Sequence, residues 1–163
     1  MSKAEKLNLE GTDAPDFSAL NQNSQMVDLS KLITKNKYTI LFFYPKDMTS
    51  GCTIESIGFS KLKKNFAGFG AKVYGISKDS VKRHCMFIAK EDLAVDLLSD
   101  ESLKMLTDYG VWVEKSMYGR NYMGISRETV VIDSEGKIIK HWQKVKPAIH
   151  PAEVLEFIES LQC

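Results

Sequence analysis

The residue best suited to chemistry in this sequence is Cys52, the last residue of Thr49-Ser50-Gly51-Cys52. A pattern typical of a buried strand precedes this segment and a helical pattern follows it, so Cys52 is expected in the first turn of a helix. Unpaired backbone N–H groups and the helix dipole at that end favour a thiolate over a thiol. The sequence therefore predicts a nucleophilic sulfur at Cys52, and a cationic neighbour would complete the site.

Two neighbours of Cys52 qualify that prediction. Glu55 lies one helical turn further on, where a carboxylate would disfavour the thiolate unless another group neutralised it. Thr49 stands where a thioredoxin would carry the first cysteine of Cys-x-x-Cys, so a disulfide inside the motif is impossible. We expect the Thr49 hydroxyl beside the sulfur instead, where it could hold a polar oxygen substrate.

The elements that must position Cys52 follow an alternating strand and helix pattern. Residues 38–44 are an apolar, β-branched and aromatic run, typical of a strand buried on both faces, and we expect this strand to be the central one. Pro45 ends it, and apolar residues recur at roughly a helical period over residues 50–66. Further strands are predicted at residues 72–77 and 95–98, helices at 80–90, 101–109 and 151–161, and a hairpin at 129–133 and 137–142 with its turn at Gly136. The sequence, without repeats or linkers, therefore predicts one α/β domain spanning residues 1–163.

Charge and composition argue against several partners. Lys and Arg number 22 against 21 Asp and Glu, the net charge is +1, and no block of like charges occurs, so we expect neither nucleic acid nor an anionic membrane as a partner. The first ten residues are polar, unlike a secretory signal, and no apolar run approaches the roughly 18 residues of a transmembrane helix. We therefore expect a cytoplasmic protein.

Neither a structural disulfide framework nor a metal site is predicted. An odd number of scattered cysteines does not make the paired framework of a small secreted fold: Cys52, Cys85 and Cys163. The three histidines show no metal-ligand spacing with them: His84, His141 and His150. The local signatures of cysteine proteases are absent as well. We expect no metal, no cofactor and no protease activity.

The pattern Pro45-x-x-x-Thr49-x-x-Cys52 matches the active-site motif of the peroxiredoxins, and on this motif the chain resembles that family. Matches to its bacterioferritin comigratory protein, or peroxiredoxin Q, branch cover nearly the whole chain: Ala14-Pro15-Asp16-Phe17, Phe43-Tyr44-Pro45-Lys46-Asp47, Tyr118-Gly119, Val145-Lys146 and His150. The resemblance implies a thioredoxin-like fold with a central mixed sheet flanked by helices. It also identifies Arg127 as the cation that family members place against the peroxidatic sulfur.

The resemblance implies a thiol-dependent peroxidase, an antioxidant oxidoreductase that reduces hydrogen peroxide and small organic hydroperoxides. The Cys52 thiolate would attack a peroxide oxygen, forming a sulfenic acid and expelling water or an alcohol. Backbone N–H groups near Cys52, the Thr49 hydroxyl and the Arg127 guanidinium would stabilise the developing charge. Two unit charges about 4 Å apart interact by about 4 kcal/mol at an effective dielectric of roughly 20, so Arg127 ranks above the helix dipole. Pro45 would shield the pocket from water.

The sequence lacks a cysteine that many members of this branch use to reduce the sulfenic acid. Many members carry a second cysteine five residues after the first, and here that position is Ile57. Cys85 is the leading replacement as resolving cysteine, because other members carry theirs on this same helix. Its alternative is a buried cysteine that packs as a small apolar residue beside Val81 and Ile88. A disulfide needs Cα atoms within roughly 7 Å, so a bridge between two helices would require local unwinding.

Two further departures and two alternative functions remain. Ser50 stands where family members usually have proline, which removes a constraint on the turn. Cys163 ends the chain and is interpreted as incidental, although a mobile terminus could reach another subunit. We expect recycling of a Cys52–Cys85 redox-active disulfide by thioredoxin or a similar thiol reductant, in a monomer or weak dimer. The alternatives are a one-cysteine peroxidase that uses an external thiol, and a redox sensor or binding protein without rapid turnover.

Overall fold

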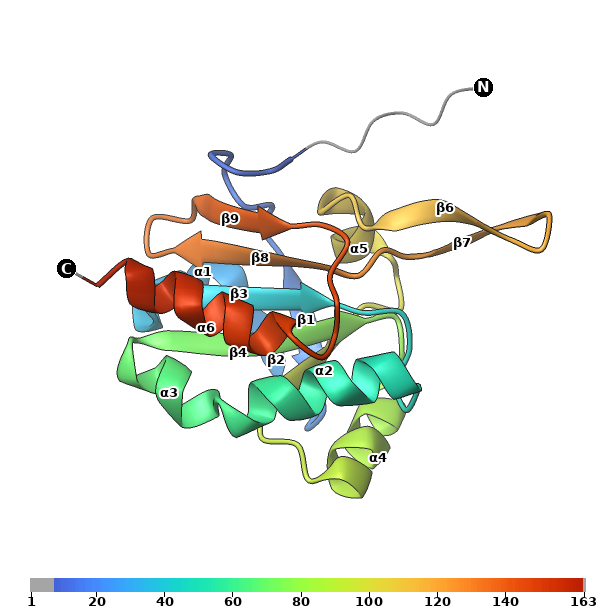
Figure 1. The fold of residues 1–163 in the computed structure, drawn as a ribbon, viewed down its shortest axis with the longest axis horizontal. Coiled ribbons are helices and arrows are strands. Elements are labelled where there is room, and N and C mark those ends of the chain that lie inside the picture. The colour runs from blue at the N-terminus through green and yellow to red at the C-terminus, as the bar shows by residue number, and fades with distance from the viewer. Residues whose placement is uncertain (1–7, 163) are drawn as a thin grey trace.

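A seven-stranded mixed sheet lies at the centre of the computed structural model, which describes residues 8–162 (Figure 1). The strand order is β2-β1-β5-β4-β3-β8-β9. Their bounds are β1 Ser18–Asn21, β2 Met26–Asp28, β3 Tyr38–Phe43, β4 Ala71–Ser77, β5 Asp96–Ser99, β8 Glu128–Asp133 and β9 Ile138–Trp142. β3 and β5 pair parallel with β4, whereas β3 pairs antiparallel with β8. The predicted α/β class with a central mixed sheet is confirmed.

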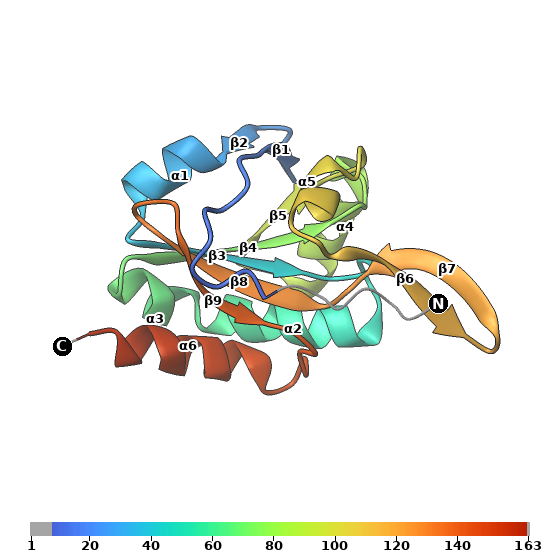
Figure 2. The ribbon, with the colours of Figure 1, turned by 90° about the horizontal axis from the view of Figure 1, so that it is seen from above.

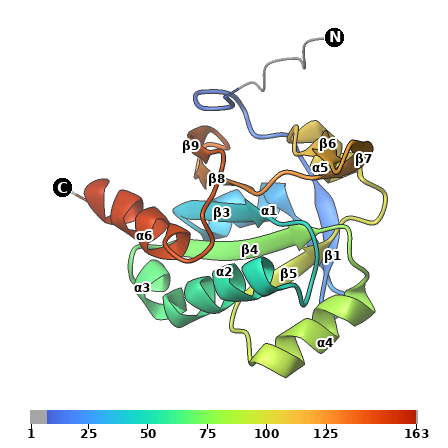
Figure 3. The ribbon, with the colours of Figure 1, turned by 45° about the vertical axis from the view of Figure 1, so that its right-hand side comes forward.

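Helices cover both faces of this sheet. Their bounds are α1 Leu29–Lys35, α2 Ser50–Lys61, α3 Lys63–Gly68, α4 Val81–Glu91, α5 Lys104–Asp108 and α6 His150–Ser160. Figure 2 shows α1 and α5 on one side of the sheet and α2, α3 and α6 on the other. Figure 3 shows α4 alongside β5. The sheet therefore separates two apolar cores, one beneath each helical layer.

β3 contributes to both cores because its side chains alternate between the two faces. Leu41 and Phe43 pack with α1 and α5, whereas Ile40 and Phe42 pack with α2, α3, α4 and α6. All six residues of β3 are buried, which explains the continuous apolar run in the sequence. β3 is an interior strand, but the middle of the sheet is β4, so the expectation that β3 would be central is wrong by one position.

The helix predicted over residues 50–66 is divided into α2 and α3. Leu62 separates them, with φ −96° and ψ 4°, and its N–H bonds to the carbonyl of Phe59 instead of continuing the α-helical pattern. Gly58 lies inside α2, where a Cβ would come within 2.7 Å of the Pro151 ring on α6. This glycine therefore lets α2 and α6 pack closely.

The hairpin of β6 (Trp112–Met117) and β7 (Arg120–Ile125) was not predicted from the sequence. Its strands pair antiparallel and it projects from the body of the molecule in Figures 1 and 2. Tyr118 and Gly119 in its turn both have positive φ, as a two-residue hairpin turn requires. β7 runs directly into the segment that carries Arg127 and then into β8. Within residues 8–162, no helix has the length and apolar character needed to cross a bilayer.

Candidate active site

Cys52 is the third residue of α2, and its side chain is fully buried in the core beneath that helix. The first hydrogen bond of the helix runs from the Thr53 N–H to the Thr49 carbonyl at 2.9 Å. The N–H groups from Thr49 to Cys52 therefore precede the regular helical hydrogen bonds, and the positive end of the helix dipole lies at the sulfur. The predicted position of Cys52 in a first helical turn is confirmed.

Arg127 brings a cation to this sulfur. Its Nη2 donates to the Cys52 Sγ at 3.2 Å. A Cβ on Gly51 would come within 3.1 Å of the same nitrogen, so the glycine leaves room for the guanidinium. Burial alone would lower the pKa of Arg127, but the negative charges of Cys52 and Glu55 raise it above the ordinary value. The guanidinium therefore stays charged beside the sulfur.

Glu55 shares the same guanidinium. Its Oε1 accepts a hydrogen bond from Arg127 Nη1 at 2.8 Å, and its side chain is fully buried. Burial raises the pKa of Glu55 to about 7, against the opposing effect of the Arg127 charge. Glu55 Oε2 is buried without a hydrogen-bond partner among the described residues. A group that neutralises Glu55 was expected beside Cys52, and Arg127 is that group. Its guanidinium bridges the Glu55 carboxyl and the Cys52 sulfur.

Thr49 and Pro45 flank the turn between β3 and α2. Thr49 is exposed at the N-cap position of α2, and its Oγ1 donates to the Lys46 carbonyl at 2.8 Å. The hydrogen bonds of residues 8–162 include none between this hydroxyl and Cys52 Sγ. Pro45 directly follows Tyr44 and is partly buried. The structure therefore places both residues on the turn that leads to Cys52, with the Thr49 hydroxyl engaged by the backbone.

Lys115, which no sequence pattern indicated, adds a second cation near the site. It lies on β6, and its Cδ would come within 3.2 Å of a Cβ on Gly124 of β7. Burial lowers the pKa of Lys115, the Arg127 charge lowers it further, and the Cys52 charge raises it. Lys115 is therefore within electrostatic reach of both groups. It was missed because it lies on the hairpin that the sequence did not predict.

Cys85 lies on α4 and is exposed. The alternative of a buried, purely apolar cysteine is therefore wrong. The buried face of α4 is formed by His84 and Phe87 instead, so Cys85 is turned away from the core. Cys52 and Cys85 are both free thiols. Cys163 lies outside the described residues.

The three histidines, which the sequence showed only as scattered residues, are all buried: His84, His141 and His150. The described part of the chain holds no cluster of three or more histidine, cysteine, aspartate or glutamate side chains arranged to bind a metal. His84 contacts Asp47 in the turn before α2, with 2.6 Å between Nδ1 and Oδ2. Neither residue was selected from the sequence, because a contact across 37 positions leaves no local pattern.

Residues 11–141 match the model of the AhpC/TSA family. The chain is 41% identical over 151 residues to peroxiredoxin Bcp of Bacillus subtilis, covering 93% of this chain and 95% of the relative. It is 45% identical over 145 residues to a putative peroxiredoxin bcp of Coxiella burnetii, covering 89% and 95%.

Solved structures agree with these matches. Xanthomonas campestris peroxiredoxin Q superimposes with a TM-score of 0.83 at 35% identity, covering 88% of this chain and 90% of that one. A structure of the bacterioferritin comigratory protein of the same organism, described for its alkyl peroxide reduction activity, gives 0.83 at 34% identity, with 89% and 91% covered. The thioredoxin-like fold that the resemblance implied is confirmed.

Proposed function

Since this chain belongs to the AhpC/TSA family of peroxiredoxins, we propose that it reduces peroxides through a sulfenic acid formed on Cys52. Its relatives support thiol-dependent peroxide reduction as the general activity. The observation that carries the assignment to Cys52 is the 3.2 Å contact between its sulfur and Arg127 Nη2 at the start of α2. A guanidinium and a helix N-terminus together favour the thiolate, which is the nucleophilic form.

In the proposed first step the Cys52 thiolate attacks one peroxide oxygen. The S–O bond forms as the O–O bond breaks, and the second oxygen leaves with a proton as water or an alcohol. Arg127 stabilises the charge that moves from sulfur to the leaving oxygen. The Thr49 hydroxyl donates to Lys46, so its lone pairs are left to accept a hydrogen bond from the peroxide O–H. Pro45 limits the access of water to the sulfur.

The substrates we propose are hydrogen peroxide and small organic hydroperoxides. The alkyl peroxide activity described for the X. campestris relative supports the organic class. A guanidinium and a hydroxyl recognise the peroxide group itself, which every member of this substrate class carries.

For the second half of the cycle we propose that Cys85 resolves the sulfenic acid. Its thiolate would attack the Cys52 sulfur and form the S–S bond as the S–O bond breaks, and the leaving oxygen would take up the proton that the Cys85 thiol gave up and depart as water. The exposure of Cys85 supports this role, since a thiol reductant such as thioredoxin could then reach the disulfide from that side. Cys52 is fully buried, so the bridge requires the first turn of α2 or part of α4 to unwind.

A coupled assay tests this function. Peroxide is added to the full chain with thioredoxin, thioredoxin reductase and NADPH, and steady NADPH consumption that Cys52→Ser abolishes is expected. Oxidation of one equivalent followed by arrest would favour the redox sensor instead. Turnover with dithiothreitol or glutathione but not with thioredoxin, and without a Cys52–Cys85 disulfide by mass spectrometry, would favour the one-cysteine peroxidase.

A further inference from the structure

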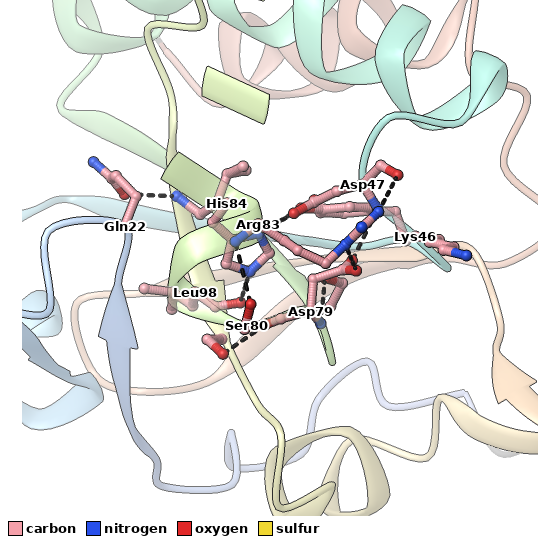
Figure 4. Close-up of polar contacts among 12 residues, drawn as sticks. Gln22, Lys46, Asp47, Asp79, Ser80, Arg83, His84 and Leu98 are labelled. Atoms are coloured by element: carbon pink, nitrogen blue, oxygen red, sulfur yellow. Dashed lines mark hydrogen bonds and ion pairs between the residues drawn. The ribbon is translucent and has the colours of Figure 1, made fainter. Parts of the chain in front are cut away.

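Asp47 lies in the turn between β3 and α2, and its hydrogen-bonding groups contact other buried or partly buried residues. Its N–H donates to Asp79 Oδ2 at 2.8 Å, and its Oδ1 accepts from the Tyr44 hydroxyl at 2.5 Å. Its Oδ2 lies 2.6 Å from His84 Nδ1, and its carbonyl accepts a long contact of 3.4 Å from Arg83 Nη2. Figure 4 shows Asp47, Asp79, Arg83 and His84 converging where the turn meets α4. Asp47 is only 1% exposed, so solvent does not substitute for these partners.

His84 is held on both sides of its ring. Nε2 lies 2.9 Å from the Leu98 carbonyl, and a carbonyl can only accept, so Nε2 carries a proton. Nδ1 shares a proton with the Asp47 carboxyl on the opposite side. Both side chains have no exposed surface. Because neither partner can turn to water, separating them would leave buried polar groups unpaired unless the surrounding structure opened.

The turn that Asp47 anchors is under local strain. Met48, the next residue, has φ +64°, a left-handed conformation that is unfavourable for a residue other than glycine. Such a conformation persists where the surrounding contacts hold it. Met48 is followed by Thr49, the N-cap of α2, and then by the first turn that carries Cys52. The contacts of Asp47 therefore fix the geometry from which Cys52 is presented.

At the other end of the contact, His84 directly precedes Cys85 in α4. Unwinding α4 to release Cys85 would displace His84, and withdrawing the turn before α2 would displace Asp47. Either movement breaks the same contact. The Asp47–His84 pair thus joins the two segments whose separation from the folded core the disulfide step requires.

We propose that His84 is a positioning residue whose contact with Asp47 holds the turn before Cys52 in its reactive conformation and must break before Cys85 can reach Cys52. The second part rests on the proposed function, whereas the first concerns the reduced protein alone. Strengthening the contact favours peroxide attack, and weakening it favours the disulfide step. His84 therefore sets the balance between the two halves of the cycle.

Two near-isosteric variants of His84 test its contacts with Asp47 and with the Leu98 carbonyl one at a time. In His84→Asn the amide nitrogen lies near the place of Nδ1 and can still donate to Asp47. In His84→Gln it lies near the place of Nε2 and can still donate to the Leu98 carbonyl, but the Asp47 contact is lost. We expect His84→Gln to slow peroxide attack on Cys52 about tenfold and to speed disulfide formation, with His84→Asn within about twofold of the parent protein.

Hydrogen exchange of the reduced chain tests the first part without peroxide. Amides of residues 46–49 and of α4 should exchange about tenfold faster in His84→Gln than in His84→Asn. Equal exchange in the two variants would overturn the proposal. If His84→Gln does not fold, Asp47→Ala provides the same comparison against Tyr44→Phe, because Tyr44→Phe removes the Tyr44 contact and leaves the Asp47 carboxylate facing His84.

Ser80→Ala is the matched control for helix stability. Ser80 caps α4 by accepting from the Arg83 N–H at 3.2 Å and does not contact Asp47. We expect it to speed disulfide formation while leaving peroxide attack within about twofold. Slowing of peroxide attack by Ser80→Ala to the extent seen in His84→Gln would assign the effect to helix stability and overturn the proposal. Failure of the parent protein to turn over peroxide or to form the disulfide would instead overturn the proposed function, with the exchange result unaffected.

Discussion

The Arg127 guanidinium lies 3.2 Å from the Cys52 sulfur, although 75 positions separate the two residues in the chain. Arg127 Nη2 contacts the sulfur and Nη1 contacts the Glu55 carboxyl. One guanidinium therefore serves two side chains whose charged forms are both anions. A planar guanidinium can contact both at once, whereas a lysine ammonium offers a single centre of charge.

Replacement of Arg127 tests this contact directly. We expect Arg127→Gln to reduce the thiolate fraction of Cys52 at neutral pH and to slow peroxide attack about 100-fold, because the charge that stabilises both the thiolate and the leaving oxygen is removed. The ultraviolet absorbance of the thiolate and stopped-flow peroxide oxidation measure the two effects. Arg127→Lys is the matched control and should retain an intermediate rate. A Gln variant as fast as the Lys variant would contradict the role of charge.

Glu55 gives a prediction for stability against pH. Burial raises the pKa of Glu55 from 4.5 to about 7 in the folded chain. Between these values the unfolded chain has released this proton and the folded chain retains it, so stability falls as the pH rises through that window and is level above it. The difference in unfolding free energy between Glu55→Gln and the parent protein should grow by up to about 3 kcal/mol from pH 4.5 to 7.

Urea unfolding of both proteins across this range measures that difference, and titrations common to both cancel. A constant difference would show that Glu55 stays ionised in the folded chain throughout the range.

Cys85→Ser separates the two steps of the proposed cycle. Thioredoxin-coupled turnover should fall by about tenfold or more, while the rate of Cys52 oxidation stays within about twofold, because Cys85 is exposed on α4 and does not contact the sulfur of Cys52 in the reduced fold. Mass spectrometry should then show Cys52 accumulating as sulfenic and, with excess peroxide, sulfinic acid. Cys163→Ser is the matched control and should turn over normally. Unchanged turnover in Cys85→Ser would remove Cys85 from the cycle.

Gly58→Ala tests the contact of α2 with α6. The added Cβ would lie 2.7 Å from the Pro151 Cγ, so the helices must separate, and we expect a loss of about 1–3 kcal/mol in unfolding free energy. Gly68→Ala in α3 is the matched control, since an added Cβ would meet no atom within 4 Å beyond its chain neighbours and its own helix backbone, and the substitution should leave stability unchanged or raise it by up to about 1 kcal/mol. Denaturant unfolding distinguishes them, and equal effects would argue against the clash.

The elements next to Cys52 could be predicted because their signals are local. β3 is buried on both faces and reads as an unbroken apolar run, and α2 begins after Pro45 in a helical pattern. The β6–β7 hairpin could not be found in this way, because most of its residues are exposed and no apolar alternation marks it. Lys115 was missed for the same reason.

The exposure of Cys85 could not be predicted from its helical spacing. Its spacing from Val81 and Ile88 fits a buried helical face, yet both residues are only partly buried. The helix instead turns His84 inward, because Asp47 and the Leu98 carbonyl receive its ring inside the protein. A buried polar side chain contradicts the hydrophobic pattern on which the prediction depended, and only the three-dimensional partners explain it.

The complete burial of the Cys52 sulfur has a consequence for the volume of the core. Each peroxide reduced adds an oxygen atom to a side chain without exposed surface, in a buried apolar cluster that also includes Phe42 and Phe59. A packed interior does not accept an extra heavy atom without displacement. The sulfenic acid therefore crowds the start of α2, and part of the free energy released by the overall reaction is held as strain in the segment that must open for the next step.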